Sequence, residues 1–258
     1  MGHPPQQRGQ RVTSASAAAS APTHWGPADA EQLNQIYAGR PLEALRDVLT
    51  DPAFGPAAIV SSFGADSAVL LHLAAGITPA VPVLFVETGW LFSETLAYAE
   101  ALAAHLRLRD VRWLQPDAAE IALKDPKRLR WSYDPDGCCA VRKVAPLDAA
   151  LAGFAISVSG RKRHQAATRA NLQLFEADGP RLKLNPLLDW SAADIAAHAA
   201  AHALPPHPLV AEGYPSIGCS PCTSRVQPGE DPRAGRWRGW DKVECGIHSV
   251  DPTDDPAF

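Results

Sequence analysis

Five cysteines offer the clearest chemistry in this sequence of 258 residues. Four of them form two pairs, the adjacent Cys138-Cys139 and the spaced Cys219 and Cys222, while Cys245 stands alone near the end of the chain. Two such pairs can supply four thiolates to zinc or to an iron–sulfur cluster. Zinc ligands are usually spaced by two to four residues, whereas adjacent thiolates suit a polynuclear cluster in which each thiolate binds a different iron. We therefore favour a [4Fe–4S] cluster over zinc or over buried unliganded thiols.

Basic side chains are concentrated close to these cysteines. Arg142 and Lys143 follow the first pair, Arg161 to Arg163 form a continuous run, and three arginines lie seven to twelve positions before Cys245. Such cations can lower the pKa of a thiol and hold a phosphate-bearing anion. The whole chain has 24 basic and 28 acidic side chains and a net charge of −4, which argues against a protein that coats nucleic acid or an anionic membrane. A bound anion must therefore be held by the local clusters.

Four short motifs contain the cysteines and their basic neighbours: residues 138–147 (CCAVRKVAPL), 218–223 (GCSPCT), 233–237 (RAGRW) and 244–248 (ECGIH). In this order they resemble the motifs of assimilatory adenosine 5′-phosphosulfate (APS) reductases, and the resemblance extends from about Ser61 to His248. It implies an adenine nucleotide α-hydrolase-like fold and a catalytic Cys245, with thioredoxin or a similar dithiol protein as the electron donor. It also implies a set of ligands for the [4Fe–4S] cluster and a set of substrate-binding residues. The implied ligands are Cys138, Cys139, Cys219 and Cys222, and the implied phosphosulfate contacts are Lys143, Arg161, Arg233 and Arg236.

The chemistry of APS agrees with a thiolate nucleophile. Its sulfur is electrophilic and AMP is a good leaving group, so attack by Cys245 would release AMP and leave a cysteine S-sulfonate. A dithiol protein would then attack the cysteine sulfur and free sulfite. A cysteine on a Gly- and Pro-rich tail can approach these two partners in turn.

Other functions remain open at this point. Reductases of the 3′-phosphorylated substrate (PAPS) are near relatives, and those confined to PAPS typically lack the paired cysteines, although a cluster-bearing enzyme could accept both substrates. An iron–sulfur RNA thiolase would need an intact phosphate loop and a basic RNA-facing surface, and neither is evident. A non-enzymatic zinc module would leave Cys245 without a purpose.

A further nucleotide-binding signal lies in residues 62–67 (SFGADS), which resemble the S-G-G-x-D-S phosphate loop of ATP pyrophosphatases. Backbone N–H groups in such a turn meet phosphate oxygens, so we expect Ser62 and Gly64 to contact the substrate. Phe63 stands where glycine is expected, which argues against ATP cleavage while leaving a nucleotide-binding turn. The polar residues 87–89 are expected to meet the adenosine.

The elements that must position these residues follow an alternating pattern. Short apolar runs at 57–61, 81–86, 111–114 and 154–159 are separated by helical patterns. The alternation predicts an α/β fold, with a mostly parallel twisted sheet that has helices on both faces. Ligands collect at the carboxyl ends of such strands, where the polar turns fall. We also expect two helices within 29–50, a helix at 191–202 capped by Ser191, and an irregular C-terminal tail. An edge hairpin is expected with strands at 172–175 and 181–184 and a turn at 178–180.

Three segments are expected: a disordered leader at 1–24, a nucleotide- and cluster-binding domain at 25–225, and a mobile tail at 226–258. No run of about eighteen apolar residues predicts a membrane span, and the thiols suit a reducing cytoplasm. A homo-oligomer is possible. His198 and His202 share a helix face but lack the Glu of H-E-x-x-H, so solvated or packed side chains are favoured over a metal site there.

Overall fold

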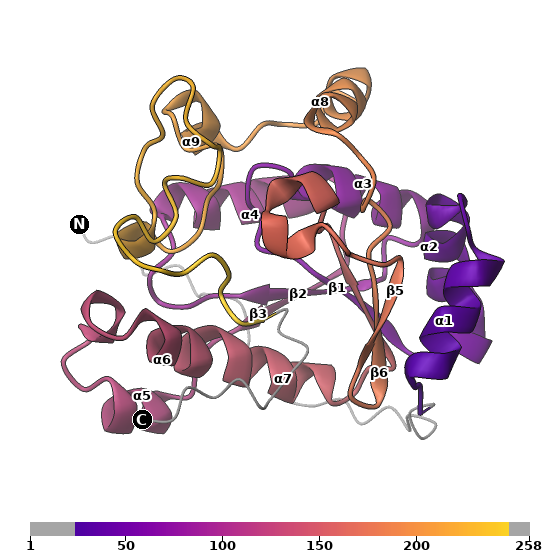
Figure 1. Cartoon of the computed structure of the whole chain (residues 1–258), viewed down its shortest axis with the longest axis horizontal. Coiled ribbons are helices and arrows are strands. Elements are labelled where there is room, and N and C mark those ends of the chain that lie inside the picture. The colour runs from indigo at the N-terminus through magenta and orange to yellow at the C-terminus, as the bar shows by residue number, and fades with distance from the viewer. Residues whose placement is uncertain (1–23, 248–258) are drawn as a thin grey trace, which may run out of the picture.

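The structure, a computed structural model, describes residues 24–247 (Figure 1). The predicted leader lies outside the described residues except for His24. Of the predicted tail, residues 226–247 are described, and residues 248–258 lie outside the described range. No helix in the described range is long and apolar enough to cross a membrane. Near its described start, the Trp25 N–H donates to the Pro180 carbonyl at 3.1 Å, which ties this end of the chain to the body of the fold.

A six-stranded sheet forms the middle layer, with the strand order β3-β2-β1-β4-β6-β5. All neighbouring pairs are parallel except β5 and β6, which are antiparallel, with β5 at the edge. The predicted mostly parallel sheet is therefore confirmed. Its strands are β1 (Ala57–Val60), β2 (Pro82–Val86), β3 (Asp110–Leu114), β4 (Ile156–Ser159), β5 (Phe175–Asp178) and β6 (Arg181–Leu184).

Helices cover both faces of the sheet, as predicted. Figure 1 shows α3 and α4 on one side of it and α6 and α7 on the other. The helices are α1 (Pro27–Ile36), α2 (Pro41–Thr50), α3 (Ser67–Ile77), α4 (Ser93–His105), α5 (Ala118–Lys124), α6 (Pro135–Cys139), α7 (Ala145–Leu151), α8 (Ala192–Ala201) and α9 (Pro208–Ala211).

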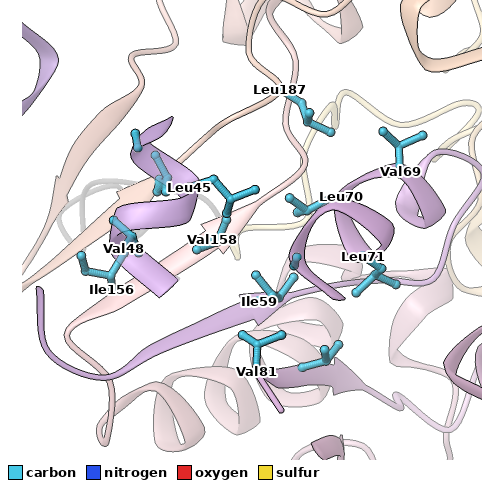
Figure 2. Packing of buried hydrophobic residues seen from close by; sticks show 14 of the residues in the cluster. Leu45, Val48, Ile59, Val69, Leu70, Leu71, Val81, Ile156, Val158 and Leu187 are labelled. Atoms are coloured by element: carbon cyan, nitrogen blue, oxygen red, sulfur yellow. The ribbon is translucent and has the colours of Figure 1, made fainter. Parts of the chain in front are cut away.

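Two apolar layers hold the helices against the sheet. On one face, Ile59 of β1 and Val158 of β4 pack near Leu70 of α3 (Figure 2). On the other face, Ala58 of β1 packs in the cluster that contains Leu147 of α7. Because successive side chains of a strand point to opposite faces, a continuous apolar run supplies both layers. Each fully buried Leu or Ile contributes about 1.5–3 kcal/mol.

The sheet has a topological switch point between β1 and β4. From β1 the chain moves outward through β2 to β3, and it returns to the other side of β1 for β4. The loops that leave β1 and β4 therefore diverge, and a crevice opens at the carboxyl ends of these strands. Ser61 follows β1 and Gly160 follows β4, so the predicted polar turn at Ser62 and the basic run that begins at Arg161 border this crevice.

Two local predictions can be compared directly with the structure. The hairpin is present, but its first strand is 175–178 rather than 172–175, and Gly179 turns the chain with φ of 59°. The predicted capping of α8 is confirmed: Ser191 Oγ accepts from the Asp194 N–H at 3.1 Å, and the Asp194 carboxylate accepts from the Ser191 N–H at 2.8 Å. These reciprocal bonds satisfy two of the first N–H groups of the helix.

Candidate functional site

A cavity of about 230 Å³ lies at the switch point. Its wall is built from the turn after β1, the loops after β2 and β4, the helical stretch after α6, and the C-terminal segment. Every residue predicted to bind the phosphate or phosphosulfate reaches this wall, and so does the predicted nucleophile. Of residues 87–89, which were expected to meet the adenosine, Thr88 lines the wall. The predicted residues on the wall are Ser62, Gly64, Lys143, Arg161, Arg233, Arg236 and Cys245.

The turn after β1 keeps the backbone shape expected of a phosphate loop. Phe63 has φ of 47°, a left-handed conformation that costs a non-glycine residue roughly 1–2 kcal/mol. Its side chain is fully buried and packs edge-on against Phe85, with ring centroids 4.9 Å apart, which offsets that cost. The Phe63 N–H donates to Ser61 Oγ at 3.2 Å. Phe63 therefore takes over the backbone role of the expected glycine, and α3 begins directly after the turn, with its positive dipole end at the cavity.

The cavity wall is strongly cationic although the chain as a whole carries −4. Only Asp66 and Glu244 contribute carboxylates to the described wall. Cations concentrated in a cleft attract an anionic ligand even when the net charge of the protein is negative. The cationic wall residues are Lys143, Arg161, Lys162, Arg169, Arg233 and Arg236.

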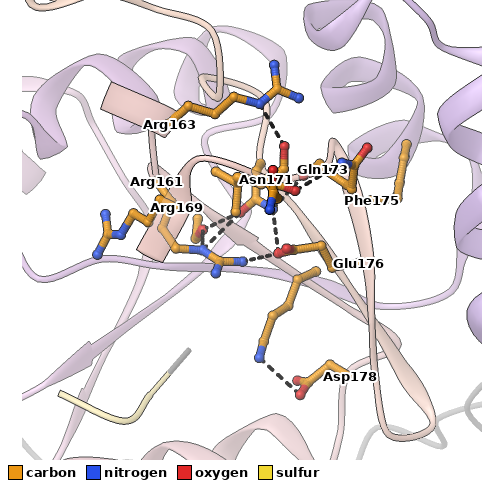
Figure 3. A network of polar contacts seen from close by, with 12 residues as sticks. Arg161, Arg163, Arg169, Asn171, Gln173, Phe175, Glu176 and Asp178 are labelled. Carbon is orange, nitrogen blue, oxygen red and sulfur yellow. Dashed lines mark hydrogen bonds and ion pairs between the residues drawn. The ribbon is translucent and has the colours of Figure 1, made fainter. Parts of the chain in front are cut away.

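Two of these cations are fixed by the loop after β4. The Arg161 guanidinium pairs with Glu176 of β5, and its Nε donates to Ser159 Oγ at 3.3 Å (Figure 3). Lys162 lies 3.1 Å from a carboxylate oxygen of Asp66 in the turn after β1. Burial lowers the pKa of the Lys162 ammonium, and Asp66 opposes that shift. The two strand ends are thus joined by an ion pair inside the cavity.

An ion-pair network holds the segment that carries Cys245. Arg169 Nε and Nη2 donate to the two carboxylate oxygens of Glu244 at 2.7 and 2.9 Å. Arg233 lies 3.4 Å from the same carboxylate and donates to the Val243 carbonyl at 2.7 Å. On the other side of Cys245, Ile247 packs against the core cluster around α7. The cysteine is therefore held between a polar anchor and an apolar one.

Gly218 allows Arg236 to approach the backbone beside the second cysteine pair. A Cβ atom at Gly218 would overlap the Arg236 guanidinium, so a larger residue there would have to displace that side chain. Thr223 and Arg236 form an antiparallel bridge, and the Trp237 N–H donates to the Cys222 carbonyl at 3.0 Å. The C-terminal segment is thus built onto the loop of the second cysteine pair.

The two cysteine pairs meet beside the cavity. Cys138 and Cys139 end α6, and a π-helical turn at Ala140–Val144 continues directly into α7. Such turns are frequent at functional sites. Cys219 bridges to Leu91 after β2, and its Sγ lies 3.2 Å from Thr88 Oγ1. The loop after β2 and the π-helical turn therefore bring sequence-distant thiols together.

The donor set fits a polynuclear cluster better than a single ion. A lone zinc bound by four thiolates at about 2.3 Å would hold their sulfurs about 3.8 Å apart. Among residues 24–247, the group of three potential ligands with all ligand atoms within 4.8 Å contains no cysteine. No three of the sulfurs of Cys138, Cys139, Cys219 and Cys222 therefore lie within 4.8 Å of one another, as they would around a lone zinc.

Burial also makes the thiols of the first cysteine pair harder to ionise than an ordinary nucleophilic cysteine. It raises the pKa of Cys138 to about 12 and that of Cys139 to about 11, with neighbouring thiols adding to both shifts. Such thiols ionise when a metal replaces the proton. Near them, the indole Nε1 of Trp90 and of Trp237 and the Arg236 Nε are buried without a hydrogen-bond partner within the described range. Buried N–H donors of this kind suit a sulfur-bearing or anionic group.

The structure also shows which arginines near the predicted site line the cavity and which lie elsewhere. Arg169 reaches the cavity, whereas Arg142, Arg163 and Arg238 do not line it. Arg142 is buried and pairs with Asp125 at 2.8 Å. No local motif marks Arg169, because its partner Glu244 is 75 positions away. The tethering role of Glu244 was likewise missed, although the residue lies in the 244–248 motif.

Comparisons with known proteins agree with this geometry. The family model of the phosphoadenosine phosphosulfate reductase domain matches residues 56–225. An adenosine 5′-phosphosulfate reductase from Mesorhizobium japonicum is 48% identical over 232 residues, or 87% of this chain and 91% of the relative. One from Chelativorans sp. is 50% identical and covers 75% of this chain and 79% of the relative.

Solved structures share the fold. Phosphoadenylyl-sulfate (PAPS) reductase from Candida auris superposes with a TM-score of 0.66 at 26% identity, covering 80% of this chain and 100% of that one. FMN adenylyltransferase from Candida glabrata superposes with a TM-score of 0.52 at 16% identity, covering 82% of this chain and 69% of that one. The second likeness concerns the fold alone.

Proposed function

Because this chain belongs to the phosphoadenosine phosphosulfate reductase domain family, we propose that it reduces adenosine 5′-phosphosulfate (APS) to sulfite and AMP in sulfate assimilation. The protein is an oxidoreductase that acts on a sulfur group. The observation that supports this most directly is one cavity in which a phosphate-loop turn, a set of cations and a single cysteine meet. Relatives named APS reductase cover most of this chain, which favours APS as the substrate.

In the proposed reaction Cys245 is the nucleophile. Its thiolate attacks the sulfur of APS, an S–S bond forms, and the bond between sulfur and the phosphate oxygen breaks with release of AMP. A thiolate of a thioredoxin-like donor then attacks Cys245 Sγ, and sulfite leaves with the electron pair of the S–S bond. The second donor thiol resolves the mixed disulfide, so that two electrons pass from the dithiol to sulfur.

The cavity wall is proposed to bind the two halves of the substrate separately. Ser62 and Gly64 contact the nucleotide phosphate, since the turn and the start of α3 present N–H groups there. Lys143, Arg233 and Arg236 hold the sulfonate and phosphate charges near Cys245. Arg161 also lines the cavity and is held in place by its ion pair with Glu176. Charge-assisted hydrogen bonds of this kind position both reacting atoms and stabilise the departing AMP.

We further propose that Cys138, Cys139, Cys219 and Cys222 hold a [4Fe–4S] cluster. This set is supported by the burial of Cys138, Cys139 and Cys219, by sulfur positions that do not suit a lone zinc, and by the unpartnered N–H groups within residues 24–247. When bound, the cluster organises the site and contributes to its electrostatic field, because direct thiolate attack needs no one-electron step.

Both thiol steps need reduced cysteines. We therefore propose that the enzyme works in the reducing cytoplasm, where Cys245 and a dithiol donor stay reduced. The cysteine must meet the small substrate and the protein donor in turn, and we propose that opening of the segment anchored by Glu244 allows this.

Mass spectrometry of the cluster-loaded protein mixed with APS and no reductant tests the nucleophile. We expect one sulfonate per chain, on the peptide that contains Cys245, and one equivalent of AMP released. The Cys245→Ser variant should form neither product while keeping its iron. A sulfonate on another cysteine, or AMP release by the Cys245→Ser variant at the normal rate, would contradict the proposed mechanism.

Iron and acid-labile sulfide analysis tests the cluster separately. We expect roughly four irons per chain in the protein as purified without oxygen. Cys139→Ser should lose iron and visible absorbance, whereas Cys245→Ser should keep both. Zinc in place of iron, or unchanged iron in Cys139→Ser, would contradict the proposed ligand set.

PAPS is a second candidate substrate because a PAPS reductase shares this fold with a TM-score of 0.66. Initial rates with each nucleotide distinguish the two. We expect a higher kcat/KM for APS, because relatives named APS reductase are 48% and 50% identical to this chain. A kcat/KM for PAPS that equals or exceeds the value for APS would refute the preference.

A further inference from the structure

Three histidines meet outside the cavity, where α8 packs on α3. They are His72 of α3 and, more than 120 positions further along the chain, His198 and His202 of α8 and its C-cap. We propose that they form a binding site for a divalent transition-metal ion, Zn²⁺ in particular, that joins α8 to α3. This site is separate from the cysteine pairs and does not depend on the proposed reaction.

The positions of the imidazole nitrogens suit a single ion. His72 Nδ1 and His198 Nε2 are 3.0 Å apart, and one ligand atom from each of the three rings lies within 4.8 Å of the other two. Nitrogens bound to one tetrahedral Zn²⁺ at about 2.05 Å are about 3.4 Å apart. The His202 ring lies with its centroid 4.4 Å from that of each partner ring. Small ring rotations would therefore direct three lone pairs to one point.

Two of the rings favour the neutral form, which is the form that binds metals. Burial lowers the pKa of His72, and His202, His198 and His105 lower it further because protonated imidazoles repel one another. Burial and His202 likewise lower the pKa of His198. Neutral imidazole is the ligand form, and a bound ion would take the place of the proton shared between His72 and His198.

The surroundings leave room for a fourth ligand. His72 and His198 are half-buried, whereas His202 is exposed, so solvent can reach the ion. Three protein nitrogens and one water form a common coordination set for zinc. Trp190 packs against His198 with ring centroids 5.5 Å apart and orients that ring from one side.

Such an ion would strengthen a contact that apolar packing makes only weakly. Ile195 is the single fully buried residue of α8, and Figure 1 shows this helix lying apart from the sheet. α3 begins at Ser67, directly after the turn that lines the cavity. A metal at His72 would therefore connect α8 to the helix that supports the phosphate loop.

Equilibrium dialysis of tag-free, cluster-loaded protein at about 10 µM free Zn²⁺ tests the site, with zinc and iron measured in each sample. We expect wild type to hold one zinc more than His72→Ala, His198→Ala and His202→Ala, at equal iron. His105→Gln is the matched control, because His105 is near His72 but outside the group, and it should bind like wild type.

A melting experiment gives a second readout that does not need the buried variants. Zinc should raise the melting temperature of wild type and of His105→Gln, and it should leave that of His202→Ala unchanged, since His202 is exposed and its loss does not disturb the core. Equal zinc content in wild type and the three alanine variants would overturn the proposal. So would a zinc-induced melting shift that survives in His202→Ala.

Discussion

Glu244→Gln is expected to release the segment that holds Cys245. The carboxylate of Glu244 accepts two hydrogen bonds from Arg169 and lies 3.4 Å from Arg233, and Arg169 is 11% exposed there. An amide keeps the shape of the side chain but loses the charge, and it can accept at only one of its two positions. The change therefore removes the charged part of the polar anchor without altering side-chain size.

The magnitude follows from the charge-assisted hydrogen bonds that an amide at position 244 cannot make. Hydrogen bonds to charged groups contribute about 1.5–3 kcal/mol, and a loss of about 2 kcal/mol corresponds to roughly a 30-fold shift of an equilibrium. Ile247 still packs on the core cluster, so the segment should open more often rather than detach. Opening should expose the half-buried Cys245 thiol to reagents.

Alkylation kinetics of Cys245, followed by mass spectrometry at one pH and in the absence of APS, measure this opening. We expect the rate in Glu244→Gln to rise by up to about 30-fold over wild type. Glu230→Gln is the matched control, because Glu230 pairs with Arg238 in the same C-terminal segment but outside the cavity. An increase of less than about threefold, or an equal increase in Glu230→Gln, would refute the inference that Glu244 anchors the nucleophile.

Three further changes test other parts of the structure. Arg142→Met leaves the buried Asp125 carboxylate unpaired and should lower the free energy of unfolding by roughly 3–5 kcal/mol in urea titrations, with partial recovery in the Asp125→Asn double variant. Gly218→Ala should displace the Arg236 guanidinium and raise the KM for APS about tenfold in initial-rate assays, whereas Gly76→Ala, which faces open space, should leave it unchanged. Burial lowers the pKa of His207 from its ordinary value of 6.5 to about 4. At a pH below about 6.5 the unfolded state therefore binds more protons than the folded state. The free energy of unfolding should therefore fall as the pH drops from about 6.5 towards about 4, by on the order of 3 kcal/mol, and urea titrations should show a flatter profile in His207→Gln.

Local patterns in the sequence were sufficient to predict most of the helices and strands. Apolar runs with no alternation predict strands buried on both faces, and β1, β2 and β4 occur close to such runs. β3 also occurs close to its predicted run, but it lies at the sheet edge and is partly exposed. The capping of α8 was predicted correctly because Ser191 and Asp194 are three positions apart and interact within one helical turn. The pairing of the cysteines is also visible in the chain itself. Their assignment as cluster ligands and that of Cys245 as nucleophile remain predictions.

Backbone shape at single residues was harder to predict. Phe63 stands where the phosphate-loop pattern has glycine, and it adopts a left-handed φ of 47° with its ring packed against Phe85. The strain is local, whereas the packing that offsets it comes from β2, more than twenty positions away. The turn of the hairpin was predicted correctly at Gly179, but its first strand was placed three residues early, since the extent of that strand is set by the pairing of Phe175 with Leu184.

Contacts between distant side chains were decided by the tertiary structure. The order of β1 and β4 in the sheet brings the turn at Ser62 beside Arg161, and docking of the C-terminal segment brings Glu244 to Arg169. His72 meets His198 only because α8 packs on α3. Hydrophobic periodicity and helix capping act over a few residues, so they can be recognised in the sequence. The contacts between distant side chains depend on how whole helices and strands pack against one another.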